Sequence, residues 1–357
     1  MEKETQKKHN GVISLWKFIF SIMIILYHYA TSTEWQYFKN GYLGVEFFFI
    51  VSGYLMTKSA LKVENKEIGK TTWKYIWRKV KELFPYILIA YVISIFVKSS
   101  FREFKTYQYV RSIWNLLLVD MSGIVTTYML GQTWYISAML ISMLILYPLI
   151  IKYKKNFIYL IAPIIVLFVG GYVSHVYGEL NLAYTWNGLV QEGILRALFE
   201  LSLGAISYEI VEKMKKINFT RIGKVLLTLI EILGIVIVFI IACRQSKNYD
   251  FIALGLLTIS IIIAFSENTI FYKYINNKFF YYLEKLSLPI YLNHIWIKDV
   301  IVNNFVNLTQ VNQLIVIISL TIAFSIITLF VVEKLKGRVA ALMKKIFVVQ
   351  QVNENIR

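Results

Sequence analysis

The sequence has few of the residues that crosslink chains, interrupt helices or bind water. It contains a single cysteine, Cys243, and four prolines among 357 residues. One cysteine excludes an internal disulfide and every metal cluster that needs several thiolate ligands. Only 17% of the residues are charged, whereas 57% are hydrophobic and the mean hydropathy is +0.59. These values exclude an ordinary soluble protein.

Long apolar runs dominate the sequence instead. Runs of about twenty residues, roughly the length that a helix needs to cross ~30 Å of hydrocarbon, recur from residue 11 to residue 333. They predict an all-α, polytopic membrane protein with about ten transmembrane helices. The predicted spans are residues 11–30, 41–60, 83–98, 133–153, 157–177, 189–211, 222–243, 249–266, 279–299 and 313–333.

The chain shows no sign of division into several domains. No Ser/Gly-rich tract marks a linker, and no repeat of fixed period is visible. We therefore predict one membrane domain at residues 11–333, between an N-terminal tail at residues 1–10 and a basic tail at residues 334–357. The first span contains Lys17 and no Ala-x-Ala site follows it, so we expect it to be retained as an anchor and not cleaved.

The basic residues are distributed unequally between the two sides of the predicted membrane. The chain has 38 Lys and Arg against 21 Asp and Glu, a formal net charge of +17. The segments on the side of both termini carry 27 of the basic residues, and the opposite segments carry 7. By the positive-inside rule, this bias predicts that both termini are cytoplasmic. It also explains the charge without a nucleic-acid partner.

A few ionisable residues inside the predicted spans are the first candidates for chemistry, because such groups are costly in hydrocarbon. Lys17 and His28 are eleven residues apart, so they share one helix face, about 16 Å apart. Both residues could also simply reach the two membrane interfaces. Glu46 lies in the next span at a depth comparable to that of His28. A carboxylate beside an imidazole fixes its tautomer and raises its basicity, as a general base requires.

Four sequence elements, in this order, resemble the membrane acyltransferase-3 family. They are Lys17 and His28 with ten residues between them, followed by Gly41–Tyr54 (GYLGVEFFFIVSGY); Arg78–Pro85 (RKVKELFP); Thr133–Ala138 (TWYISA); and Ser287–His294 (SLPIYLNH). The chain departs from the usual pattern at four of these positions. Lys17 and Lys81 each replace a common Arg, Glu46 replaces a common Asp, and Glu82 replaces a residue that is often basic.

The resemblance implies an enzyme of the bacterial plasma membrane that moves acyl groups, often acetyl from acetyl-CoA, onto a cell-surface carbohydrate or glycolipid. It implies that acetyl-CoA is a donor substrate and that no cofactor stays bound. The implied catalytic residues are His28 and Glu46. The implied donor-binding residues, whose cations lie toward the inner membrane face, are Lys17, Arg78, Lys79 and Lys81. We expect no appended extracytoplasmic domain.

Three residues are candidates for the acceptor side. Trp134 and Tyr135 could stack on a sugar ring or belong to the outer aromatic belt. His294 is either an interfacial histidine or part of the acceptor site. Glu192 and Glu200 flank Arg196 at helical spacing, which predicts an internally paired structural cluster. The four histidines lack metal-ligand spacing, and no Gly-x-Ser-x-Gly elbow exists.

The sequence leaves alternatives open for the mechanism and for the function. His28 could take the proton of the acceptor hydroxyl or could itself carry the acetyl group. The same line of polar residues could form the pathway of a transporter or flippase for a lipid-linked saccharide. A third reading is an inactive partner in a cell-wall assembly complex.

Overall fold

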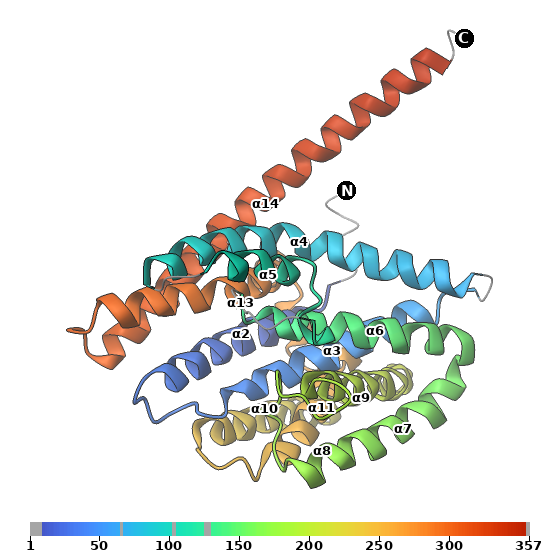
Figure 1. Cartoon of the computed structure of the whole chain (residues 1–357). Coiled ribbons are helices and arrows are strands. Elements are labelled where there is room, and N and C mark those ends of the chain that lie inside the picture. The colour runs from blue at the N-terminus through green and yellow to red at the C-terminus, as the bar shows by residue number, and fades with distance from the viewer. Residues whose placement is uncertain (1–8, 65–66, 102–104, 125–129, 355–357) are drawn as a thin grey trace.

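The chain folds into a bundle of long helices, shown as a computed structural model in Figure 1. The structure describes residues 9–64, 67–101, 105–124 and 130–354, and these residues contain no β-strand. The longer helices are α2 (Gly11–Ser32), α3 (Gly44–Ala60), α4 (Ile68–Phe101), α5 (Thr106–Leu116), α6 (Thr133–Tyr153), α9 (Glu192–Met214), α10 (Arg221–Cys243), α11 (Asp250–Ser266), α13 (Lys278–Asn304) and α14 (Gln310–Glu354). The short helices are η1 (Gly41–Leu43), η2 (Asp120–Ser122), η3 (Phe157–Ile161), α7 (Ala162–Ile165), η4 (Val166–Gly170), α8 (Gly171–Val176) and α12 (Tyr272–Ile275).

The prediction of an all-α fold is confirmed for the described residues. Each of the ten predicted spans overlaps a helix or, between residues 157 and 176, a continuous run of α-helical and π-helical turns. Within the described residues, six helical stretches are long and apolar enough to cross a membrane: Gly11–Ser32, Ile68–Ser100, Thr133–Tyr153, Phe157–Val176, Arg221–Cys243 and Gln310–Arg338. Of the other four, α3 and α11 are 17 residues long, and α9 and α13 carry several charged residues.

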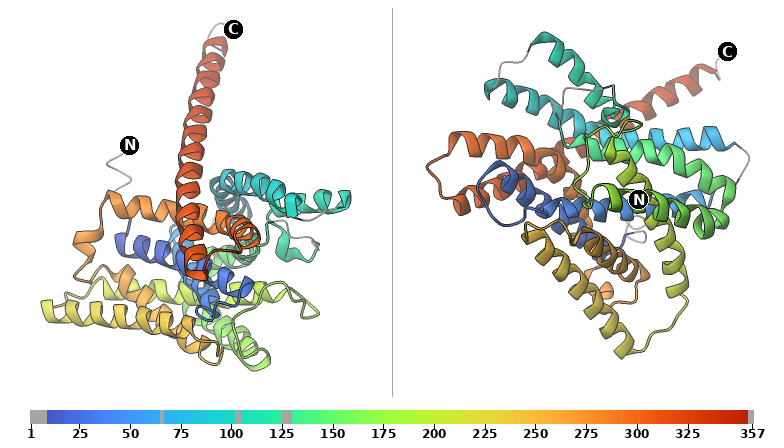
Figure 2. Two further views of the ribbon diagram at one scale, coloured as in Figure 1. Left: turned by 90° about the vertical axis from the view of Figure 1, so that its left-hand side faces the viewer. Right: turned by 60° about the horizontal axis from the view of Figure 1, so that its bottom comes forward.

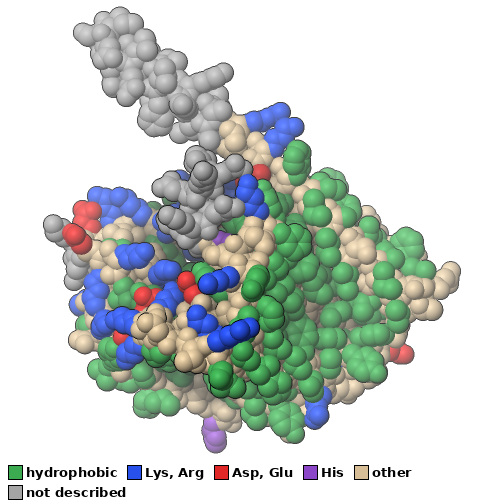
Figure 3. Space-filling model, turned by 180° about the vertical axis from the view of Figure 1, so that it is seen from behind, with side chains coloured by type: hydrophobic (Ala, Val, Ile, Leu, Met, Phe, Trp, Pro, Cys, Tyr) green, Lys and Arg blue, Asp and Glu red, His purple; other side chains and the backbone are tan. Residues whose placement is uncertain are grey.

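The two ends of the bundle differ in charge. Figure 3 shows Lys and Arg side chains gathered at one end of the molecule, next to a broad apolar surface. We call this the basic end; the loops after α3 and α6 lie there, whereas the loops after α2 and α13 lie at the opposite end (Figure 1). The chain therefore separates charge as a membrane protein does, with an apolar belt between two polar ends.

The basic stretch before the third predicted span belongs to the same helix as that span. Residues 68–82 form the first part of α4, which continues without interruption to Phe101. The one glycine between Ile68 and Pro85 is Gly69 in the first turn, and Pro85 itself is accommodated inside the helix. Trp73 and Trp77 on this segment are 62% and 47% exposed, as expected for aromatic residues at a headgroup layer.

Helices α3 and α9 pack against each other through glycines at the centre of the bundle. A Cβ atom on Gly53 would lie 2.2 Å from the Leu201 carbonyl oxygen, and one on Gly204 would lie 2.2 Å from the Ile50 carbonyl oxygen. Only glycine allows two helix backbones to approach this closely. The glycines therefore fix the distance and the register between these two helices.

The last helix, α14, is 45 residues long, which corresponds to about 67 Å. Its first part packs against α13 and α4. Its C-terminal part extends away from the bundle, as the views in Figures 1 and 2 agree. This length exceeds the thickness of a membrane. Because α14 runs from Gln310 to Glu354, the predicted tail at residues 334–357 begins inside this helix.

Candidate functional site

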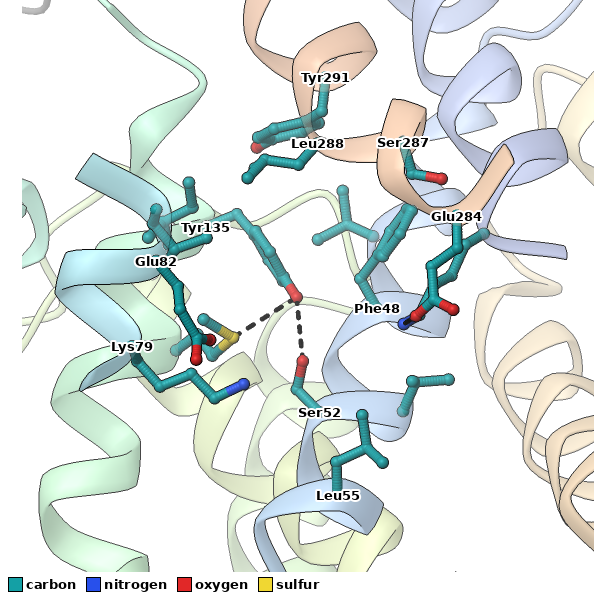
Figure 4. Close-up of a pocket in the computed structure, with 16 residues that line it drawn as sticks. Phe48, Ser52, Leu55, Lys79, Glu82, Tyr135, Glu284, Ser287, Leu288 and Tyr291 are labelled. Atoms are coloured by element: carbon teal, nitrogen blue, oxygen red, sulfur yellow. Dashed lines mark hydrogen bonds and ion pairs between the residues drawn. The ribbon is translucent and has the colours of Figure 1, made fainter. Parts of the chain in front are cut away.

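Among the cavities lined by the described residues, one lies in each half of the bundle and contains predicted site residues. The first, which we call the inner cavity, has a volume of about 250 Å³ and lies between α2, α3, α4, α6 and α13 (Figure 4). Its lining is mostly apolar. The polar side chains that line it are Lys17, Ser52, Lys79, Glu82, Tyr135, Glu284, Ser287 and Tyr291. Lys17 lies in the first half of the first predicted span and Lys79 lies just before the third, so this cavity belongs to the half of the bundle near the basic end.

Two of the four predicted donor-binding cations line the inner cavity. Lys17 forms an ion pair with Glu284 of α13, and the Ser14 hydroxyl donates a hydrogen bond of 2.7 Å to the same carboxylate. Lys79 reaches into the cavity from α4, with Glu82 beside it (Figure 4). The cavity therefore holds two cations and two carboxylates.

The other two predicted donor-binding cations do not line this cavity. The guanidinium of Arg78 lies 5.6 Å from the ring centre of Tyr75, and the amine of Lys81 lies 5.5 Å from the ring centre of Trp77. Both residues are exposed on α4. They can reach a ligand only where it extends beyond the cavity.

Tyr135 and Ser52 form a polar contact within the inner cavity. Their hydroxyl oxygens are 3.4 Å apart, and the Tyr135 hydroxyl also donates to the sulfur of Met139 at 3.6 Å (Figure 4). The Tyr135 ring lies 4.5 Å from that of Phe49 and 5.9 Å from that of Tyr291. Tyr135, which we predicted for the acceptor side, thus contributes to the inner cavity.

The second cavity, which we call the outer cavity, has a volume of about 260 Å³. It is lined by aromatic rings, amides and a few charged groups. The polar and aromatic lining residues are Tyr27, His28, Tyr42, Lys98, Gln132, Trp134, Asn181, Tyr184, Arg196 and Tyr291. His28 sits near the end of α2 and Lys98 near the end of α4, so this cavity lies in the half of the bundle away from the basic end.

His28 lies next to a second histidine. Its ring centre is 5.0 Å from that of His294 and 4.9 Å from that of Tyr27. His294 is fully buried, and neither of its ring nitrogens has a hydrogen-bond partner among the described residues. A buried polar group without a partner is costly and often marks a functional site. The structure thus brings together two histidines that lie 266 positions apart.

Glu46 does not contact His28 as the sequence suggested. It binds Arg196 of α9: the Arg196 Nε donates a 2.8 Å hydrogen bond to one carboxylate oxygen, and Nη2 pairs with the other. The reason lies in helix packing, since Glu46 and Arg196 precede Gly53 and Gly204 by seven and eight residues on two helices in close contact. They therefore meet at the same depth in the bundle.

Arg196 holds several groups around the outer cavity. Its Nε lies 3.4 Å from a Glu200 oxygen, its Nη2 lies 3.3 Å from the Tyr42 carbonyl oxygen, and its guanidinium lies 5.3 Å from the centre of the Trp134 ring. All three ionisable side chains of the Glu46–Arg196–Glu200 cluster are at most 1% exposed. The expected pairing with Glu200 is present, but Glu46 and not Glu192 supplies the second carboxylate.

The start of α6, which carries Trp134, is fixed by Asp120. Asn115 and the Thr133 hydroxyl each donate a hydrogen bond of 2.5 Å to its carboxylate. Burial raises the pKa of the Asp120 carboxyl, and the two hydrogen bonds oppose this shift. A carboxylate at this position also interacts favourably with the helix N-terminus.

Two residues line both cavities: Val45 on α3 and Tyr291 on α13. Sequence reasoning did not select either of them, nor Ser52 or Glu284, as site residues. Glu284 could have been selected, because it is an ionisable residue inside a predicted span. Val45 carried no signal at all, since an apolar residue in an apolar helix is expected. In the described part of the chain, no group of three His, Cys, Asp or Glu could hold a metal ion.

The chain matches the model of the acyltransferase-3 family, described as an acyltransferase domain, over residues 10–332. It therefore belongs to this family. The chain is also 29% identical over 119 residues to proteins named "Putative O-acetyltransferase" in Staphylococcus aureus strains COL, MSSA476 and MRSA252. The match covers 32% of this chain and 17% of each relative, so it spans less than a fifth of their length. No solved structure matches the chain.

Proposed function

We propose that the protein transfers acetyl from acetyl-CoA, bound from the basic end, to a hydroxyl of a carbohydrate or glycolipid at the opposite end. The pair of cavities carries this proposal, because they lie one after the other through the bundle and share Val45 and Tyr291 as walls. Donor and acceptor can then approach from the two faces of the membrane and react where the cavities meet.

The inner cavity suits the narrow, mostly apolar arm of a CoA thioester. Its apolar lining receives the arm, while Lys79 supplies a cation for the polar groups behind it. Arg78 and Lys81 lie within two residues of Lys79 on the exposed side of α4. We assign them to the nucleotide phosphates, which stay outside the cavity. Acetyl-CoA is a substrate in this scheme, and no bound cofactor is required.

The outer cavity suits a sugar. Trp134, Tyr27 and Tyr184 offer ring faces on which a pyranose can stack, and the amides of Asn181 and Gln132 offer donors and acceptors for its hydroxyls. A single hydroxyl of such an acceptor has to reach the ring of His28, which lines the same cavity.

In the proposed reaction, the acceptor oxygen attacks the thioester carbonyl. A carbon–oxygen bond forms, the carbon–sulfur bond breaks, and His28 takes the hydroxyl proton, which finally resides on the CoA thiol. Glu46 has a positioning role: it binds Arg196, and Arg196 lines the outer cavity. An acetyl group carried briefly on His28 gives the same products; we favour the base role, because it needs only one transfer.

We further propose that all ten spans predicted from the sequence cross the cytoplasmic membrane and that both termini are cytoplasmic. The excess of basic residues at one end supports this orientation. Residues 11–333 then form the membrane domain, with tails at residues 1–10 and 334–357. Helices α3, α9 and α13 would be tolerated in the bilayer because their charged groups face one another inside the bundle.

The test is to incubate the purified full chain, in detergent, with acetyl-CoA and to measure the release of CoA thiol with and without added glycan. We expect slow release to water alone and faster release when the correct acceptor is present. A protein that never releases the thiol but moves a lipid-linked saccharide across vesicles would be a transporter, and the proposal would be wrong.

A further inference from the structure

The boundary between the two cavities is formed by two buried side chains. Val45 is 5% exposed and Tyr291 is 6% exposed, and each lines both cavities. They come from α3 and α13, helices that are more than 200 residues apart in the chain. The acyl end of a donor bound in the inner cavity has to pass between these side chains to reach His28, which lines only the outer cavity.

Tyr291 is held in place by its neighbours. Its hydroxyl donates a 2.5 Å hydrogen bond to the carbonyl oxygen of Gln132, and its ring lies 5.9 Å from the rings of Tyr135 and His294. A hydrogen bond at one end of the ring and aromatic contacts along it leave the side chain little freedom. Tyr291 therefore forms a fixed wall at this boundary.

Val45 is held equally firmly, through its two neighbours in sequence. Glu46 binds Arg196 through two hydrogen bonds. A Cβ atom on Gly44 would lie 3.1 Å from the Phe20 carbonyl oxygen, which shows how closely α3 packs on α2 at this point. The backbone of α3 cannot retreat from either contact, so the space at the boundary depends on the size of the Val45 side chain.

We infer that Val45 and Tyr291 select the length of the acyl group, and that the site is built for short chains. This inference rests on the proposed function. When the acceptor oxygen attacks and the carbon–sulfur bond breaks, the thioester carbonyl must lie within reach of His28, so its alkyl group lies against Val45 and Tyr291. Each added methylene then meets two walls that cannot move.

The experiment compares acetyl-CoA with propionyl-CoA as donors for the purified full chain, with release of CoA thiol to water as the readout. Val45→Ala removes two methyl groups from the boundary, and we expect it to raise the ratio of kcat/KM for propionyl-CoA to that for acetyl-CoA by about tenfold. Val45→Ile adds one methyl group and should lower the same ratio. A ratio that rises in the order Ile, Val, Ala supports the inference.

Val51→Ala is the matched control. Val51 lies on the same helix, is 2% exposed and lines the inner cavity but not the outer one. The same two methyl groups are removed, and the propionyl to acetyl ratio should stay near the wild-type value. Equal thermal midpoints of the variants in detergent exclude a difference in folding.

Two negative results of this experiment would have different meanings. If wild-type protein releases no thiol from either donor, the proposed function fails, and this inference fails with it. If wild type and Val51→Ala are active but the Val45 series shows one constant ratio, the acyltransferase stands and the boundary does not select the acyl group. An equal rise for Val45→Ala and Val51→Ala also overturns the inference.

Discussion

At the residue scale, the buried polar groups of the site differ in how many hydrogen-bond partners they have. Arg196 is surrounded by oxygens and makes contacts in every direction. His294 has no hydrogen-bond partner for its ring nitrogens among the described residues, and His28 packs against it. A buried cation with several oxygen partners stabilises a fold, whereas a buried imidazole without a partner is more often kept for a reaction. This difference favours the histidines as the reactive groups.

His28→Ala should lower acetyl transfer by roughly 10²–10⁴-fold, the usual contribution of a positioned acid or base. Insertion and folding should be intact, since removing a polar group from a membrane span relieves a cost. The measurement is thiol release per amount of purified protein. His175→Ala, at an exposed histidine of α8, is the control and should keep full activity. A His28→Ala variant with the wild-type rate would contradict the assignment.

Lys79→Ala should raise the apparent KM for acetyl-CoA more than Lys81→Ala does. Lys79 lines the inner cavity, whereas the Lys81 amine lies over the Trp77 ring outside it. Phosphate and carbonyl contacts of a donor mostly give uniform binding, so kcat should change little in both variants. Steady-state kinetics with varied acetyl-CoA measures both constants. If Lys81→Ala has the larger effect on KM, the donor contacts α4 from its exposed side only.

Arg196→Ala should destabilise the protein by about 3–5 kcal/mol, because it leaves the Glu46 and Glu200 carboxylates buried without a cation. The loss is measured as a lower thermal midpoint in detergent and a lower yield of inserted protein. Arg221→Ala, at the exposed start of α10, should leave both values unchanged. Wild-type stability of the Arg196→Ala variant would show that the cluster is not needed for folding.

At the element scale, helix positions followed from hydrophobic runs, but side-chain pairs did not. The span predicted at residues 133–153 is helix α6 to the residue, and α2 differs from its prediction by two residues at one end. Apolar length and end signals such as Asn10, whose side chain caps α2, are local properties. The pairing of Glu46 with Arg196 depends on contacts between helices 150 positions apart, and no local pattern encodes it.

The packing of α3 against α9 is the contact on which both cavities depend. Gly204→Ala places a methyl group 2.2 Å from the Ile50 carbonyl oxygen, so the helices have to separate. We expect a lower thermal midpoint and a loss of thiol release together, because Val45 and Glu46 move with α3. Gly255→Ala is the control: its added methyl meets no atom within 4 Å, and it should be neutral or slightly stabilising. Equal effects of the two variants would refute the role of this contact.

At the scale of the whole molecule, the charge bias predicts an orientation that chemical labelling can measure. With Cys243 replaced by Ser, a cysteine introduced as Asn307→Cys lies in the exposed loop after α13, and one introduced as Lys216→Cys lies in the exposed loop after α9. A membrane-impermeant maleimide should label the first in intact cells and the second only after lysis. The reverse pattern would invert the topology and with it the sides of donor and acceptor.

The separation of the two cavities by Val45 and Tyr291 determines how much charge has to cross the membrane potential. A carrier that shuttled a charged donor across the bilayer would work against the membrane potential, at about 2.3 kcal/mol per elementary charge for every 100 mV. In the proposed reaction, the charged nucleotide stays on its own side, and only a small uncharged group passes the boundary. The cell would then modify its outer surface without moving a charged donor against the membrane potential.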